Sequence, residues 1–160
     1  MTISDVAQSD LEDVWSLNQD SVPQVSSVEF AEMQWFANRA HYFRVARFAD
    51  ELAGFLIGLR PGLSYGSPNY RWFSENYSDF GYIDRVAVSA AARRSGVATR
   101  LYRDFAASLG PDVGVMTCEV NIRPANESSM RYHENFGFEK VGTQETEGGK
   151  KEVALLEMKL

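Results

Sequence analysis

Residues 92–102 combine chemistry-bearing side chains with the start of a helix. Their sequence, ARRSGVATRLY, places Arg93, Arg94 and Gly96 directly before a helical pattern. The first N–H groups of a helix have no partner inside the helix, and the helix dipole adds partial positive charge there. Glycine lets the backbone approach a ligand closely, and arginines add charge and donors. The segment therefore predicts a pyrophosphate cradle, with an ordinary helix start and solvated arginines as the alternative.

Two familiar phosphate motifs are absent from this segment. It has no Gly-Lys-Ser/Thr ending of a Walker A loop and no G-x-G-x-x-G spacing. Both absences weigh against a nucleotide-phosphate binder of the usual kinds.

The elements before the segment follow from caps and alternation. Residues 2–7 read as a short strand, and Ser9 with Glu12 forms a capping box for a helix to about residue 18. The same signal at Ser26 and Glu29 predicts a second helix to about residue 39. Residues 42–48 and 52–60 are rich in β-branched and aromatic residues around a turn, which predicts a hairpin.

The elements after residue 60 begin with a long polar and aromatic stretch. We expect residues 61–79 to form a loop, because Gly, Pro, Ser and Asn interrupt it throughout. A strand over residues 80–89 follows. An apolar residue at every fourth position then marks an amphipathic helix to residue 109. This strand, loop and helix, followed by a strand ending near residue 120, predict a parallel βαβ unit in a mostly antiparallel sheet.

The last third predicts one helix and one hairpin. Asn126 is the expected N-cap of a short helix that Gly137 ends. A Gly148-Gly149 turn then joins two closing strands. We expect a single α/β domain over residues 1–160.

Composition narrows the function classes. The net charge of −6 disfavours a nonspecific nucleic-acid binder, and no apolar run is long enough for a membrane span. The first residues lack a secretory signal pattern, and Cys118 is the only cysteine. We therefore expect a cytoplasmic protein with no disulfide.

Two motifs in order resemble those of the GCN5-related N-acetyltransferases (GNAT). Arg93-x-x-Gly96-x-Ala98 resembles motif A, Arg/Gln-x-x-Gly-x-Gly/Ala. NESSMRYHENFGF, from Asn126 to Phe138, resembles motif B of the same family. The resemblance covers nearly the whole chain and is strongest to a bacterial branch of predicted acetyltransferases. It implies a mixed sheet of about seven strands with a splayed parallel pair, flanked by about four helices.

The resemblance also implies acetyl-CoA as co-substrate, with no metal. Its pantetheine arm would pair with the backbone of the strand that includes Val86, Ala87 and Val88. Its pyrophosphate would lie on the loop formed by Arg93, Arg94, Ser95, Gly96, Val97, Ala98 and Thr99. Asn126, Ser129 and His133 match further cofactor contacts, although Asn126 also suits a helix cap.

Two carboxylates compete as the base that deprotonates the acceptor amine. Asp84, the favoured candidate, lies on the strand expected to pair with the cofactor, and Glu119 lies near the end of the next strand. A salt bridge is the structural alternative for Asp84, and a structural hydrogen bond is the alternative for Glu119. Strand alternation predicts Asp84, Val86 and Val88 on the face opposite Arg85 and Ala87.

The proton donor to the leaving thiolate is also open between two residues. Family members often place a tyrosine seven residues after the motif B asparagine, and here that position holds His133, with Tyr132 one residue earlier. The position favours His133 as the donor, and the alternative is a histidine on an exposed helix face with no role in catalysis.

The aromatic stretch would border the acceptor through Tyr70, Trp72, Phe73 and Glu75, unless it only packs its own cluster.

Three functions follow in order. The first is N-acetylation of a primary amine on a small or amino-acid-like acceptor. The second is acetylation of protein N-termini or lysines, and the third is a non-catalytic acyl-CoA-binding regulatory module. The resemblance also makes a homodimer an expected partner state.

Overall fold

The computed structural model describes residues 1–160 and divides them into two compact units. The first unit comprises Met1–Leu59 and Ile83–Gly110, and the second comprises Arg60–Tyr82 and Pro111–Leu160. Seven strands form one sheet in the order β1-β2-β3-β4-β5-β7-β6, and β4 (Gly81–Val88) belongs to both units. This mixed α/β arrangement confirms the predicted fold class.

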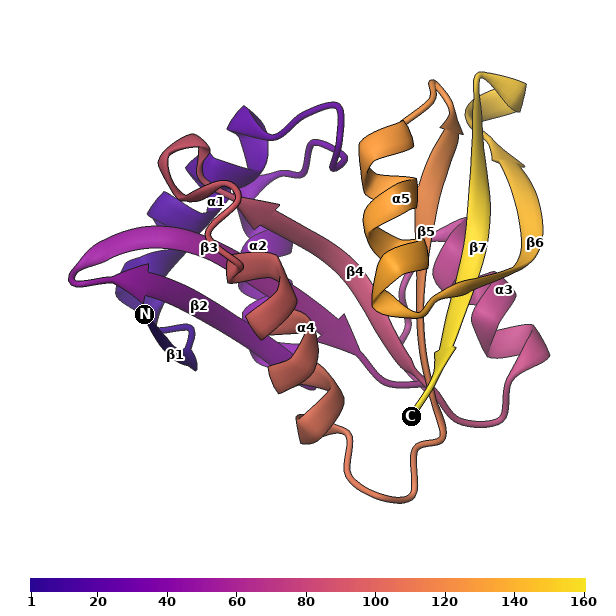
Figure 1. The fold of residues 1–160 in the computed structure, drawn as a ribbon, viewed down its shortest axis with the longest axis horizontal. Coiled ribbons are helices and arrows are strands. Elements are labelled where there is room, and N and C mark those ends of the chain that lie inside the picture. Colours follow the sequence, from indigo (N-terminus) through magenta and orange to yellow (C-terminus); the bar gives the residue numbers. More distant parts are fainter. The chain divides into compact units, whose positions relative to one another are not determined.

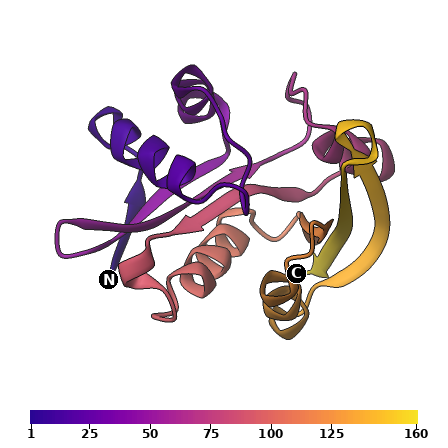
Figure 2. The same ribbon diagram turned by 90° about the horizontal axis from the view of Figure 1, so that it is seen from above.

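The first unit contains an antiparallel meander covered on both faces. Strands β1 (Thr2–Asp5), β2 (Tyr42–Phe48) and β3 (Glu51–Leu59) pair in sequence order. Helices α1 (Leu11–Asp20) and α2 (Phe30–Arg39) lie on one face of these strands, and α4 (Val97–Ser108) lies on the other (Figure 1 and Figure 2).

Helix α4 packs on β3 as its periodicity predicts. Val97, Leu101 and Phe105 are all at most 1% exposed. Gly58 of β3 leaves the space for the Phe105 ring, which a Cβ at that position would overlap. Gly54 lies under the start of α4, where a Cβ would come within 2.7 Å of the Ala87 carbonyl oxygen. Small residues on β3 therefore set how closely α4 and β4 approach this strand.

The second unit is a three-stranded antiparallel ladder with one parallel neighbour. Strand β5 (Val115–Arg123) pairs with β7 (Lys151–Lys159), which pairs with β6 (Glu139–Thr146). The start of β4 pairs in parallel with β5 through Gly81↔Met116 and Tyr82↔Thr117, as the predicted βαβ unit requires. Helices α3 (Pro68–Asn76) and α5 (Glu127–Phe136) lie on opposite faces of these strands (Figure 1 and Figure 2).

Helix α3 corrects the expected loop over residues 61–79 and brings the α-helix count to five. Ser67 caps it, because its hydroxyl accepts a hydrogen bond from the Tyr70 N–H at 3.2 Å, and Pro68 occupies the first helical position. The helix buries Tyr70 and Phe73 in an aromatic cluster. The free energy gained by burying these rings outweighs the preference of the surrounding Gly, Pro and Asn residues for turns.

Two expected helix caps are also wrong. The Ser9 box is replaced by a short 3₁₀ turn over Gln8–Asp10, where the Asp10 carboxylate accepts the Ala7 N–H at 2.8 Å. Helix α2 begins three residues later than Ser26 predicts, after Glu29, whose N–H donates to the Glu32 carboxylate at 3.2 Å. The Ser26 carbonyl oxygen instead accepts a hydrogen bond from the buried Arg85 of β4, which holds Ser26 outside the helix.

Candidate active site

The loop before α4 has the backbone of an anion cradle. Gly96 adopts φ 81° as the N-cap of α4, and Arg94 also has a positive φ of 62°. Arg93, Arg94, Ser95 and Gly96 are exposed, and a Cβ at Gly96 would meet nothing within 4 Å. Helices α3 and α5 have side-chain caps, whereas no side chain caps α4. The open N-terminus of α4 therefore suits an anionic group such as pyrophosphate.

Strand β4 leads directly into this loop. Val86 and Val88 are partly exposed near its end, and Ala87 between them is buried against Gly54 of β3. These are the residues expected to pair with the cofactor arm. Val97, Ala98 and Thr99 follow as the first turn of α4, with Val97 buried and the other two partly exposed.

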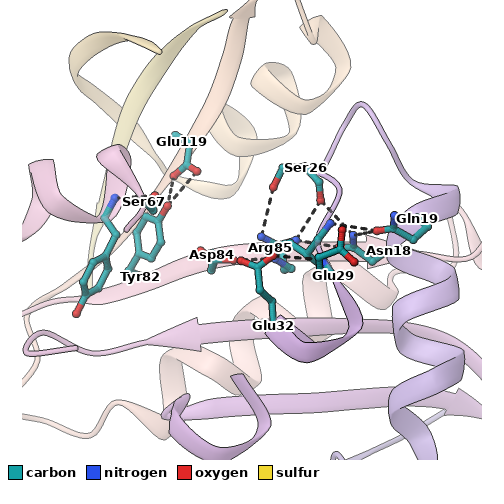
Figure 3. Close-up of polar contacts among 12 residues, drawn as sticks. Asn18, Gln19, Ser26, Glu29, Glu32, Ser67, Tyr82, Asp84, Arg85 and Glu119 are labelled. Atoms are coloured by element: carbon teal, nitrogen blue, oxygen red, sulfur yellow. Dashed lines mark hydrogen bonds and ion pairs between the residues drawn. The ribbon is translucent and has the colours of Figure 1, made fainter. Parts of the chain in front are cut away.

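Asp84 is tied into a buried polar cluster of the first unit (Figure 3). Its Oδ2 lies 2.7 Å from Arg85 Nε, and the two side chains are 3% and 5% exposed. The Arg85 guanidinium also donates to Asn18 Oδ1 and to the Ser26 carbonyl oxygen, each at 3.1 Å. Asn18 is fully buried and donates to the same Ser26 oxygen at 3.1 Å. The cluster holds the segment between α1 and α2 against β4.

Exposure along this part of β4 alternates as the sequence predicts. As whole residues, Asp84, Val86 and Val88 are partly exposed, whereas Arg85 and Ala87 are buried. The Arg85 side chain nevertheless reaches the carboxylate of the adjacent Asp84.

Glu119 is paired with a tyrosine that the sequence did not single out. Tyr82 Oη donates to the Glu119 carboxylate, with its oxygens at 2.8 and 3.0 Å (Figure 3). Tyr82 is fully buried, whereas Glu119 is partly exposed. The pair lies where β4 and β5 run in parallel, because Tyr82 is in register with Thr117, two residues before Glu119. The pair thus joins β4 and β5 through their side chains as well as their backbones.

Helix α5 brings together three of the predicted residues. Asn126 caps it, its side chain accepting from the Ser129 N–H at 3.2 Å, as expected. One turn on, His133 Nδ1 donates to the Ser129 carbonyl oxygen at 2.7 Å. The neutral His133 ring therefore carries its proton on Nδ1 and a lone pair on Nε2.

His133 is buried, which corrects the alternative that placed it on an exposed helix face. It is 6% exposed, and its ring packs edge-on against Phe138 with centroids 5.3 Å apart. Burial lowers the pKa of His133 below its ordinary value, and the bond to the Ser129 carbonyl raises it to a smaller extent. Tyr132 is only partly buried, with its ring perpendicular to His133.

The predicted acceptor residues divide into two sets. Tyr70 and Phe73 are buried and pack against Tyr82 at ring-centroid distances of 5.6 and 5.7 Å. Trp72 is partly exposed, and Glu75 is exposed. Tyr70 and Phe73 form a structural cluster, as the alternative interpretation expected, and Trp72 joins its edge with its ring 5.2 Å from that of Phe73.

Two negative findings complete the description. No group of three or more His, Cys, Asp or Glu side chains has the arrangement of a metal site. None of the helices has the length and hydropathy that crossing a bilayer requires.

The seven-stranded sheet with its βαβ unit defines the class as a mixed α/β protein, and comparison with known proteins shows the family. The model of the acetyltransferase (GNAT) family matches residues 11–138, so the chain belongs to this family and is an N-acetyltransferase. No curated protein matches the chain.

Solved structures share the fold at low identity. The ribosomal-protein-S18-alanine N-acetyltransferase from Escherichia coli is 15% identical, with 99% of this chain and 92% of that one covered and a TM-score of 0.74. Ard1 from Thermoplasma volcanium is 18% identical over 99% and 97% of the chains, with a TM-score of 0.79. A candidate phosphinothricin N-acetyltransferase is 20% identical over 99% and 98%, with a TM-score of 0.71.

Proposed function

We propose that the protein transfers the acetyl group of acetyl-CoA to a primary amine of a small or amino-acid-like acceptor. The observation that carries this proposal is the exposed, glycine-capped N-terminus of α4, which follows β4 and has no side-chain cap. Backbone N–H groups of this turn would bind the pyrophosphate, with Arg93 and Arg94 adding charge. Val86–Val88 would pair with the pantetheine arm, and Asn126 and Ser129 stay predicted cofactor contacts.

Glu119 is the base in this proposal, in preference to Asp84. The Asp84 carboxylate is almost fully buried and already accepts from Arg85, which leaves it little access to an amine. Glu119 is a partly exposed residue, and its carboxylate accepts from Tyr82 Oη. A carboxylate has about four lone-pair positions, so Glu119 could also take the proton of an acceptor amine, directly or through water.

Tyr132 is the proton donor in this proposal, in preference to His133. The Nδ1 proton of His133 is committed to the Ser129 carbonyl, and burial disfavours the imidazolium that would donate from Nε2. Tyr132 is partly exposed one residue earlier and carries a phenolic proton. His133 then serves to hold α5 against Phe138.

The reaction balances with these two groups. Glu119 takes one proton from the acceptor ammonium, and the lone pair of the resulting neutral amine forms the new C–N bond to the acetyl carbon. As the C–S bond breaks, Tyr132 gives its proton to the departing sulfur. The second nitrogen proton, lost as the amide forms, restores the Tyr132 hydroxyl directly or through water, and the proton on Glu119 passes to solvent. The products are the acetylated amine and free CoA. Trp72 and Glu75 would meet the acceptor, where a ring face and a carboxylate both attract a cation.

An acceptor panel followed by free thiol release tests this function. The panel contains small primary amines, amino acids and short peptides with free or blocked N-termini. We expect thiol release with small amines and a mass increase of one acetyl group on the acceptor. Thiol release only with free peptide N-termini would identify proteins as the acceptors, and CoA binding without thiol release would favour a regulatory module.

A single domain over residues 1–160, a homodimer and a cytoplasmic location stay predictions.

A further inference from the structure

The hydroxyl group of Tyr82 is fixed in place by the packing of its own ring. The ring is fully buried and meets Tyr70 and Phe73 of α3 at 5.6 and 5.7 Å. Tyr70 is itself anchored, because its hydroxyl donates to the Arg60 carbonyl oxygen at 2.8 Å and accepts from the Leu63 N–H at 3.1 Å. A ring packed this closely holds its Oη at one point.

The strands fix the other partner of the pair. Tyr82 is in register with Thr117 across the parallel ladder, and the Thr117 hydroxyl donates to the Gly81 carbonyl oxygen at 3.0 Å. Glu119 follows Thr117 by two residues, so its side chain leaves the same face of β5. The register therefore brings the Glu119 carboxylate to Tyr82 Oη.

We propose that Tyr82 is a positioning residue for Glu119. Helix α3 supports this role by packing Tyr70 and Phe73 against the Tyr82 ring, in addition to any contact with an acceptor. This inference rests on the proposed role of Glu119 as base. Tyr82 keeps its own proton throughout the reaction and donates it to the carboxylate as a hydrogen bond. The carboxylate is thereby held in one rotamer, from which it would take the proton of the amine directly or through a bridging water.

Substitution of Tyr82 by Phe removes the hydroxyl and leaves the ring cluster in place. Tyr82→Phe should lower kcat by roughly tenfold to a hundredfold, because a carboxylate without this bond spends less time in the productive geometry. The KM for acetyl-CoA should stay within about twofold, since the cofactor loop is untouched. Unchanged kcat in Tyr82→Phe would overturn the inference.

Tyr77 provides a matched control in the same unit. Its Oη donates to Glu157 at 2.5 Å, and its ring also packs against Phe73, at 5.9 Å. Glu157 has no role in the proposed reaction, so Tyr77→Phe should leave kcat within about twofold of the parent. An equal loss of kcat in both variants would mean that the cluster, and not the bond to Glu119, sets the rate, which would contradict the inference.

A double-mutant cycle separates positioning from direct catalysis. In a Glu119→Gln background, Tyr82→Phe should change kcat by less than about twofold, because no base remains to be positioned. A full additional loss in that background would assign Tyr82 a direct role and refute the inference. Glu119→Asp should lose most of the sensitivity to Tyr82→Phe as well, since the shorter side chain no longer reaches Oη.

The inference and the proposed function fail in different ways. If Glu119→Gln keeps the parent kcat, the base assignment and this inference both fail, although acetyl transfer by the parent stands. If the parent releases no thiol with any acceptor, the proposed function fails first. Far-UV circular dichroism and thermal melts of each variant confirm that kcat values compare folded proteins.

Discussion

Asp84 and Arg85 form a buried ion pair, and its contribution to the free energy of unfolding can be compared with that of an exposed pair. Asp84→Ala leaves the Arg85 cation buried without its carboxylate. Removing one partner of a buried pair costs about 3–5 kcal/mol of unfolding free energy. Arg85 keeps its bonds to Asn18 and Ser26 and lies over the Phe36 ring at 5.3 Å, so we expect the low end, about 3 kcal/mol.

Asp5 provides the control for this change. Its Oδ1 lies 2.8 Å from Arg44 Nε, which matches the 2.7 Å of the Asp84–Arg85 pair, but its side chain is 84% exposed instead of 3%. Asp5→Ala should therefore cost at most about 1 kcal/mol. The two substitutions remove the same chemical group from the same kind of contact and differ mainly in burial.

Urea unfolding followed by circular dichroism measures both losses. A difference of about 2 kcal/mol corresponds to roughly 4–8 °C in the thermal midpoint for a chain of this size. If Asp84→Ala costs no more than Asp5→Ala, the buried pair does not anchor the segment between α1 and α2. Asp84→Asn, which keeps the shape, should also keep most of kcat, and a large loss there would return the base role to Asp84.

Four further outcomes follow from the loop before α4, from Gly58 of β3 and from α5. Gly96→Asp should weaken CoA binding by at least about tenfold in calorimetry, because it adds negative charge and a Cβ at φ 81° where pyrophosphate should lie, and unchanged affinity in a folded variant would refute the cradle. Gly58→Ala should lower the thermal midpoint, because its Cβ overlaps the Phe105 ring, and an unchanged midpoint would contradict the close packing of α4 on β3. Burial lowers the pKa of His133, so the contribution of the neutral ring to the free energy of unfolding is fully present above about pH 6.5 and is lost as the pH falls. The parent should therefore lose its stability advantage over His133→Gln between about pH 7.5 and about pH 5.5. An advantage that grows over this range would contradict the lowered pKa. Tyr132→Phe should lower kcat more than His133→Gln does, and the opposite order would return the acid role to His133.

Local patterns predicted most of the fold. The hairpins, the parallel βαβ unit, the four-residue period of α4 and the Asn126 cap all depend on residues near one another in sequence. Helix α3 was missed although Ser67 and Pro68 carry a start signal, because the surrounding Gly, Pro and Asn residues dominate the pattern. Its stability comes from burial of Tyr70 and Phe73, which local propensity does not report.

The candidate site was predicted less completely, since its contacts depend on register. The sequence singled out Glu119 but not Tyr82, because nothing local tells which β4 residue faces which β5 residue. Asn18 likewise reads as the end of a helix, and its role as a partner of Arg85 follows only from folding α1 against β4. The side chains that hold the candidate site together are therefore the ones that sequence patterns leave out.

The most direct test of the central claim compares thiol release from acetyl-CoA by the parent and by Glu119→Gln, with an amine acceptor identified in the panel. The proposed mechanism predicts one acetylated amine per thiol released by the parent. It also predicts a loss of about a hundredfold or more in kcat for Glu119→Gln, with CoA affinity retained. Full turnover by a folded Glu119→Gln would contradict the assignment of the base, and thiol release without acetylated amine would contradict the transferase itself.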